Sequence, residues 1–312
     1  MSVGRRVAAR RKVCFALLVA ILLTSVGCGG SEDGEPVHFL TVDTDPDWSP
    51  DAQLIAFASS RRFGGLFVVR PDGTGLRRIF HGNASNPDWS PDGRRIAFQG
   101  SNGIYLIARA GGRPRRILRG SRFSLPAWAP DGRTIAVVKW ENDQSTAIYA
   151  FESAGKHLRR LSPPRTGDVI AGSETEPAWA PGGRRIAFQR GNGRIVVMDI
   201  ASGRRRVIAV GSDEPAWSPD GTTIAFESNG ALWSTSADGE RDRHLLTSNG
   251  GDASWAPDSR SLVFEVRHWF GRFWRRPQSL SIADATGGGL RKLTYGGSVY
   301  DDLGWRGDRA TP

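Results

Sequence analysis

The sequence is poor in cysteine and has no long apolar run. Its 312 residues contain only two cysteines, Cys14 and Cys28, and Cys14 lies in an N-terminal segment that we expect to be removed. One remaining cysteine cannot form an internal disulfide. The apolar run from Val13 to Leu23 is shorter than the roughly 20 residues that a membrane-spanning helix needs. Neither a disulfide framework nor a transmembrane helix is therefore expected.

The familiar catalytic signatures are also missing. There is no Gly-x-Ser-x-Gly elbow, His-Glu-x-x-His pair, P-loop or dinucleotide fingerprint, so hydrolase, metalloprotease and nucleotide-dependent chemistry have no motif to support them. Of the five histidines, we expect only His38, His81 and His268 to reach one common face, while His157 and His244 lie at the rim. No catalytic residue is assigned, and no enzymatic activity is expected.

What the chain does contain is one phrase, repeated six times. A tryptophan is followed by Ser or Ala, then Pro, then a turn residue. The six tryptophans are Trp48, Trp89, Trp128, Trp179, Trp217 and Trp255, with a degenerate echo at Trp305. Successive tryptophans lie 41, 39, 51, 38, 38 and 50 residues apart, which is the period of a four-stranded propeller blade.

Each repeat also predicts its four strands. The phrase is the turn of a hairpin, because Pro presets φ, Asp bonds back to the backbone and Gly tolerates positive φ. An apolar strand such as Ile96-Ala97-Phe98 follows, then a third apolar run, and then a basic-apolar segment such as Arg115-Arg116-Ile117. The sequence therefore predicts an all-β protein, a six-bladed β-propeller of four-stranded antiparallel blades. A cramped seventh blade is the alternative.

These units resemble the WD40-like PD40 repeats of the TolB family. The resemblance covers residues 39 to 305 and rests on the repeated tryptophan phrase. It implies six blades and a role in the cell envelope. No segment resembles the N-terminal α/β domain that TolB carries, so the resemblance extends only to the propeller part.

The N-terminus is typical of an exported protein. Arg5, Arg6 and three further basic residues precede the short apolar run, and small residues follow it, as in a secretory signal. The cut region resembles a bacterial lipobox, which would place a lipid on Cys28; the alternative is an ordinary signal peptide with an incidental cysteine. The predicted parts are a signal peptide (1–27), a flexible tether (28–37), the propeller (38–306) and a tail (307–312). We expect a monomer, lipid-anchored to the bacterial cell membrane or envelope and extracytoplasmic.

The charge does not indicate a nucleic-acid partner. The formal net charge is +10, but removal of the signal takes away five basic residues and no acidic ones. An exported protein has little occasion to meet nucleic acid, and the expected partner is a protein or an envelope component.

An aromatic and basic run marks the first candidate site. In a propeller, the loops after second and fourth strands share one face, and every long insertion is expected there: 139–146, 163–175, 266–278 and 295–304. One of these loops carries His268, Trp269, Phe270, Arg272, Phe273, Trp274, Arg275 and Arg276. Trp and Arg are enriched at binding hot spots, so the run is a candidate surface for a partner or a membrane. The alternative is that its rings pack on their own blade, as a longer second-to-third hairpin.

The second candidate site is an acidic ring three residues before the tryptophans. Its members are Asp45, Asn86, Glu176, Glu214, Asp252 and Asp302, and Leu125 interrupts it. First strands line the axis of a propeller, so these side chains are expected at the channel mouth, where they would hold Ca²⁺ or a basic segment of a partner. The structural alternative is that each carboxylate only bonds backbone amides.

Together these features favour a non-enzymatic binding module for a protein or envelope ligand. The alternative is a propeller that binds or cleaves a glycan, with channel carboxylates acting on the sugar, as in propeller lyases that act on acidic sugars and use a histidine-rich metal site.

The lipid anchor is testable by cell fractionation. Cys28→Ser removes the only thiol that a lipobox enzyme would acylate, so the protein should move from the membrane fraction to the soluble fraction. Unchanged retention in the membrane fraction would contradict the anchor.

Overall fold

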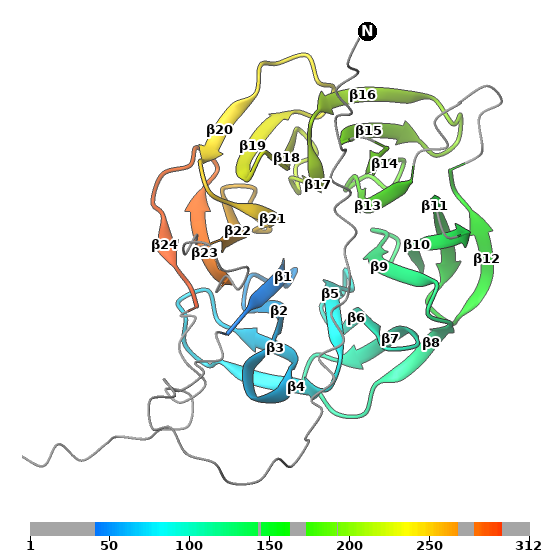
Figure 1. Ribbon diagram of the computed structural model, residues 1–312, viewed down its shortest axis with the longest axis vertical. Helices are drawn as coiled ribbons and strands as arrows, with labels where there is room; N and C mark the ends of the chain where they lie inside the picture. Colours follow the sequence, from blue (N-terminus) through cyan, green and yellow to red (C-terminus); the bar gives the residue numbers. More distant parts are fainter. Residues whose placement is uncertain (1–40, 143–144, 163–172, 192, 268–277, 295–312) are drawn as a thin grey trace, which may run out of the picture. The chain divides into compact units, whose positions relative to one another are not determined.

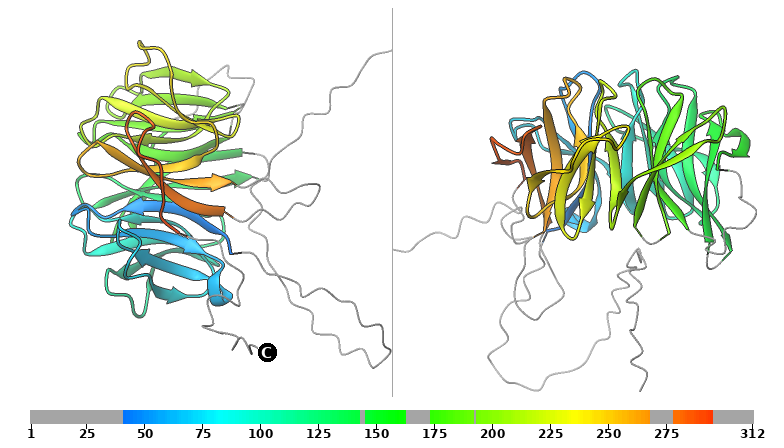
Figure 2. Two further views of the ribbon diagram at one scale, coloured as in Figure 1. Left: turned by 90° about the vertical axis from the view of Figure 1, so that its left-hand side faces the viewer. Right: turned by 90° about the horizontal axis from the view of Figure 1, so that it is seen from above.

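The computed structural model describes residues 41–142, 145–162, 173–191, 193–267 and 278–294 (Figure 1). These residues form six four-stranded antiparallel sheets, each built from four consecutive strands. The sheets stand around a common axis as the blades of a propeller (Figures 1 and 2). The predicted six-bladed all-β fold is confirmed.

The first three blades follow the chain without crossovers. Their strands are β1 (Asp43–Trp48), β2 (Ile55–Ser59), β3 (Gly65–Val69) and β4 (Arg77–His81); β5 (Ala84–Trp89), β6 (Arg95–Gly100), β7 (Gly103–Ala108) and β8 (Arg115–Arg119); and β9 (Phe123–Trp128), β10 (Thr134–Asn142), β11 (Ser145–Glu152) and β12 (Lys156–Arg160). Helix is limited, in the described residues, to the 3-10 turn η1 (Arg61–Phe63).

The last three blades repeat the same order. Their strands are β13 (Glu174–Trp179), β14 (Arg185–Arg190), β15 (Arg194–Asp199) and β16 (Arg205–Val210); β17 (Asp213–Trp217), β18 (Thr223–Ser228), β19 (Ala231–Ser236) and β20 (His244–Thr247); and β21 (Gly251–Trp255), β22 (Ser261–Arg267), β23 (Gln278–Asp284) and β24 (Arg291–Lys292). The first strand of each blade lies nearest the axis (Figure 1).

We call the two ends of the propeller the turn face and the loop face. The turn face carries the Pro-Asp-Gly turns between first and second strands. In blade 2 Gly93 donates its N–H to the Ser90 carbonyl (2.8 Å), and Gly93 has a φ of 65°, which Gly adopts without strain. The loop face carries the connections after second and fourth strands.

Most of one predicted loop-face insertion is strand. Residues 139–142 belong to β10 and residues 145–146 to β11, with Trp140 opposite Thr146 and Asn142 opposite Ser145. The expectation of a loop over these residues is wrong. β22 and β23 extend to Arg267 and Gln278, which pair with each other. The aromatic run at 268–277 lies outside the described residues.

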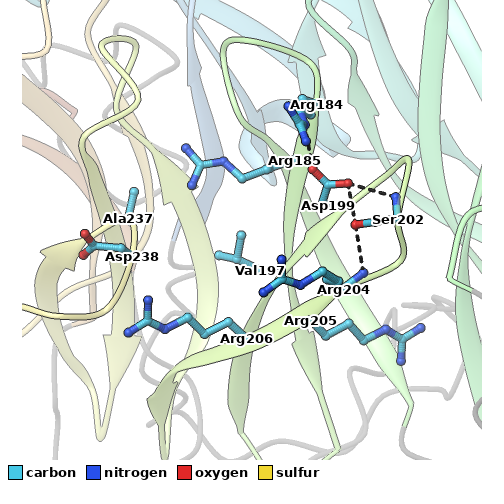
Figure 3. Close-up of a pocket in the computed structure, with 10 residues that line it drawn as sticks. All are labelled: Arg184, Arg185, Val197, Asp199, Ser202, Arg204, Arg205, Arg206, Ala237 and Asp238. Atoms are coloured by element: carbon cyan, nitrogen blue, oxygen red, sulfur yellow. Dashed lines mark hydrogen bonds and ion pairs between the residues drawn. The ribbon is translucent and has the colours of Figure 1, made fainter.

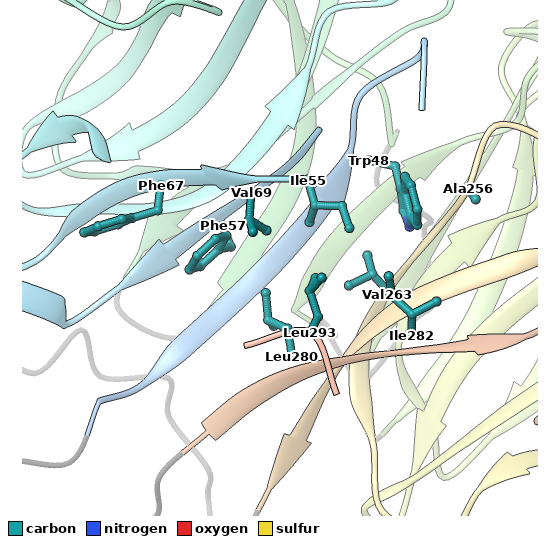
Figure 4. Close-up of a cluster of buried hydrophobic side chains, with 10 residues drawn as sticks. All are labelled: Trp48, Ile55, Phe57, Phe67, Val69, Ala256, Val263, Leu280, Ile282 and Leu293. Carbon is teal, nitrogen blue, oxygen red and sulfur yellow. The ribbon is translucent and has the colours of Figure 1, made fainter. Parts of the chain in front are cut away.

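The hydrophobic core lies between the blades. Each of the six main clusters joins two neighbouring sheets. Five of them include a repeated tryptophan, and the half-buried Trp179 packs against the remaining one. The seam that closes the ring places Trp48 and Phe57 of blade 1 against Val263, Leu280 and Leu293 of blade 6 (Figure 4). Burial of these apolar side chains is what holds the first blade to the last.

The closing seam gives a stability prediction. Leu280 is fully buried, so Leu280→Ala should lower the free energy of unfolding by about 2–5 kcal/mol in chemical denaturation. Leu290→Ala in the same blade removes a largely exposed side chain and should change it by less than about 0.5 kcal/mol. Equal effects of the two variants would contradict the assigned seam.

Candidate functional site: an axial carboxylate cluster

The acidic ring lies on a β-bulge that recurs in every blade. The pairing between first and second strands shifts register three residues before the tryptophan, for example between Thr44 and Asp47. A proline, which has no N–H to offer a ladder, follows the bulged residue in five blades. The bulged residues, Asp45, Asn86, Leu125, Glu176, Glu214 and Asp252, all have φ between 41° and 54°. Non-glycine residues in this region are uncommon and strained.

The bulge aims these side chains at the next blade. Asp45 Oδ2 accepts the backbone N–H of Asn86 (3.1 Å), and its Oδ1 accepts the Asn86 side-chain amide (3.1 Å). Glu214 Oε2 accepts the N–H of Asp252 (2.6 Å). The structural alternative therefore holds for these two carboxylates, with the amides supplied by the neighbouring strand. They stabilise the contact between neighbouring blades.

The ring is completed by a residue that the sequence reasoning missed. Glu265 of β22 is buried, and its Oε1 accepts the N–H of Asp45 (2.9 Å) across the closing seam. One carboxylate oxygen from each of Asp45, Asp252 and Glu265 lies within 4.8 Å of the others. The available signal was an acidic residue in a second strand, where the other repeats carry Ala, Val or Gln, or, in blade 5, Glu227.

The charged residues of the innermost strands are all acidic. The six innermost strands carry nine carboxylates and no Lys, Arg or His. Asp43 pairs with Arg61 (2.6 Å) and Glu174 with Arg205 (3.5 Å). The charged groups that act on Glu176 and on Asp252 are other carboxylates.

This crowding changes the protonation of the cluster. Burial, reinforced by Asp45 and Asp213, raises the pKa of Glu176 to about 8. Burial and the neighbouring carboxylates, Asp45 first among them, raise the pKa of Asp252 well above its ordinary value. A second layer behaves likewise, since burial raises the pKa of Asp47 to about 6 even though Trp89 N–H and Ser254 donate to it. An added positive charge would relieve this repulsion.

The other predicted site residues have different outcomes. Asp302 and the run from His268 to Arg276 lie outside the described residues, as do His38 and Cys28. His81 is exposed at the end of β4, so only one of the three expected loop-face histidines is placed. No helix among the described residues is long and apolar enough to cross a membrane.

The fold and this axis define the class: a six-bladed β-propeller with an acidic centre. Residues 35–170 match the family model described as the TolB beta propeller domain. No curated protein matches the sequence significantly. The expected resemblance to PD40-type TolB propellers is thus confirmed.

Solved structures agree on the fold. TolB from Acinetobacter baumannii is 19% identical with a TM-score of 0.65, and the match covers 83% of this chain and 64% of that one. A TolB-type protein from Agrobacterium tumefaciens is 22% identical with a TM-score of 0.61, covering 72% and 86%. An oligogalacturonate lyase from Vibrio parahaemolyticus is 13% identical with a TM-score of 0.52, covering 78% of each chain. This chain thus spans less than two thirds of the Acinetobacter protein.

The raised pKa of Glu176 predicts a pH-dependent stability. The folded protein keeps this proton up to about pH 8, whereas an unfolded glutamate releases it near pH 4.5. The contribution is fully present below pH 4.5 and is lost as pH rises through about 8. Glu176→Gln should flatten this fall. Because water partly reaches the side chain, we expect the variant to gain about 1–2 kcal/mol over wild type at pH 8.5.

Urea denaturation at pH 5, 7 and 8.5 measures this effect. The exposed Glu240→Gln serves as the control and should follow the wild-type curve. Parallel curves for wild type and Glu176→Gln would show that Glu176 does not carry the excess proton.

Proposed function

We propose that this protein is a non-enzymatic binding module that receives a cationic feature of a protein or envelope ligand at the axial carboxylate cluster. The observation that carries the proposal is the convergence of Asp45, Asp252 and Glu265 on an axis that holds no basic residue in its innermost strands. Mutual repulsion leaves the cluster short of positive charge, and a ligand cation supplies it.

A divalent ion fits the same donors. Carboxylate oxygens are the ligands that Ca²⁺ prefers, and three of them supply part of its shell of six to eight oxygens. In this form of the proposal, the ion bridges the cluster to an acidic or carbonyl group of the partner.

The place of the aromatic run in the sequence supports the same face. Glu265 lies two residues before the end of β22, and residues 268–277 continue directly from that strand. The aromatic and basic residues of the run, His268 to Arg276, therefore belong to the connection that follows the cluster. We propose that they supply anchoring contacts beside the axial carboxylate cluster.

The proposed location follows from the N-terminus and the TolB-like fold together. We propose an exported protein tethered through Cys28, acting in the cell envelope as a monomer.

A glycan-processing role is the second candidate. It is favoured by Glu176, whose pKa of about 8 keeps the side chain protonated near neutral pH, as a general acid requires. The two functions separate by mutation: loss of one catalytic acid abolishes turnover, whereas loss of one binding carboxylate weakens binding by degrees.

Calorimetric titration with a hexa-arginine peptide and, separately, with CaCl₂ tests the binding function. Wild type should bind at least one of these probes, and Asp252→Asn should weaken that binding about tenfold or more. Asp258→Asn is the matched control, because Asp258 is an exposed carboxylate on the turn face that bonds the N–H of Arg260.

Retained folding of both variants is checked by thermal melting. The proposal is overturned if neither probe binds wild type, or if Asp252→Asn and Asp258→Asn bind the probe as well as wild type does.

A further inference from the structure

On the turn face, the blade-4 turn departs from the repeated pattern. In five blades the turn contains an aspartate that accepts the N–H of the residue two positions on, at 2.8 to 3.1 Å. These aspartates are Asp51, Asp92, Asp131, Asp220 and Asp258. In blade 4 the corresponding residue is Gly182.

The blade-4 turn keeps its backbone shape without the carboxylate. Gly183 donates its N–H to the Ala180 carbonyl (2.8 Å), as in the other turns. A Cβ added at Gly182 would meet nothing within 4 Å, and Gly182 is not in the left-handed region. The N–H of Arg184, the counterpart of the capped donors, has no acceptor among the described residues. The turn therefore presents an open donor in open space.

Arginines line two hollows at this turn. One hollow between blades 4 and 5 is lined by Pro181, Gly182, Arg184, Arg185 and Asp220, among others. A second hollow shares Arg184 and Arg185 and adds Arg204, Arg205, Arg206 and Asp238 (Figure 3). The two hollows together are lined by five arginines and three carboxylates.

Two of the arginines are held in place. Arg184 Nε donates to Asp199 Oδ2 (2.7 Å), and Asp199 is fixed in turn by the N–H and hydroxyl of Ser202. The Arg185 guanidinium lies over the Trp217 ring at 5.0 Å. Because these side chains already have protein partners, they lose less conformational entropy when a ligand binds.

The three carboxylates are turned to local donors. Asp199 serves Arg184 and Ser202. Asp220 accepts from Ser218 (2.6 Å) and from the N–H of Thr222 (3.0 Å). Asp238 accepts the N–H of Glu240 (3.1 Å). They cap their own turns, and none of these hydrogen bonds involves the Arg184 N–H.

We propose that the blade-4 turn is a binding site for a phosphate group. A phosphate oxygen accepts the Arg184 N–H in place of the missing aspartate, and the guanidinium groups of Arg184 and Arg185 bind the remaining oxygens. Planar guanidinium groups match the geometry of phosphate and form strong charge-assisted hydrogen bonds with it. The phosphate comes either from a soluble molecule or from a lipid headgroup.

Replacing the glycine tests the site with little risk to the fold. Gly182→Asp restores the residue that five other turns carry, so its melting temperature should equal or exceed that of wild type. Isothermal titration with inorganic phosphate, against chloride at equal ionic strength, should show at least a tenfold loss of affinity in this variant. Gln53→Glu adds the same charge to the exposed turn of blade 1 and should stay within twofold of wild type.

Vesicles distinguish the two sources of phosphate. Wild type should bind vesicles that contain phosphatidic acid, and not vesicles of phosphatidylcholine alone, if the source is a lipid; binding of free phosphate only would indicate a soluble ligand. Asp252→Asn should leave phosphate affinity unchanged, so this site fails or stands independently of the axial cluster. Failure of wild type to bind phosphate, or equal binding by Gly182→Asp, would overturn the proposal.

Discussion

The contact between neighbouring blades is the constraint on which the rest of the molecule depends. Each blade packs its tryptophan against the blade before it, and in some blades the strand backbone at that point also bonds to the neighbouring sheet. Asp47 accepts the N–H of Trp89 (2.7 Å), whose indole N–H donates to the Asp47 carbonyl (3.2 Å). Asp88 accepts the N–H of Trp128 in the same way, because a carboxylate is a strong acceptor for an amide in a poorly hydrated place.

Charge is therefore sorted radially. The innermost strands carry nine carboxylates and no basic residue, whereas the six outermost strands carry twelve Lys or Arg and no carboxylate. Burial and the neighbouring carboxylates near the axis raise the pKa values of Glu176 and Asp252. At the turn face, arginines outnumber carboxylates around the blade-4 turn that lacks its aspartate. The two proposed sites thus differ in sign and lie at different radii of one scaffold.

The fold could be predicted from the sequence because each repeat carries its own turn chemistry at a fixed spacing. The strand pairing at 139–142 and 145–146 was not expected, because Glu and Asn are depleted in strands, yet Asn142 pairs with Ser145. Glu265 was missed for a different reason. It meets Asp45 only once the ring closes, 220 residues along the chain, and no local pattern contains that contact. The sequence shows that Gly182 replaces the repeated aspartate. That the replacement leaves a backbone N–H without its acceptor follows only from the hydrogen bonds of the other five turns.

The proposal that a partner binds at the acidic axis can be tested in living cells. A photo-crosslinking amino acid is placed at Asn86, a neutral and partly exposed member of the ring, with the same probe at Gln53 on the turn face for comparison. We expect a discrete crosslinked partner from position 86 that disappears when Asp252 is changed to Asn. Adducts that form only from position 53, or that persist without Asp252, would contradict it.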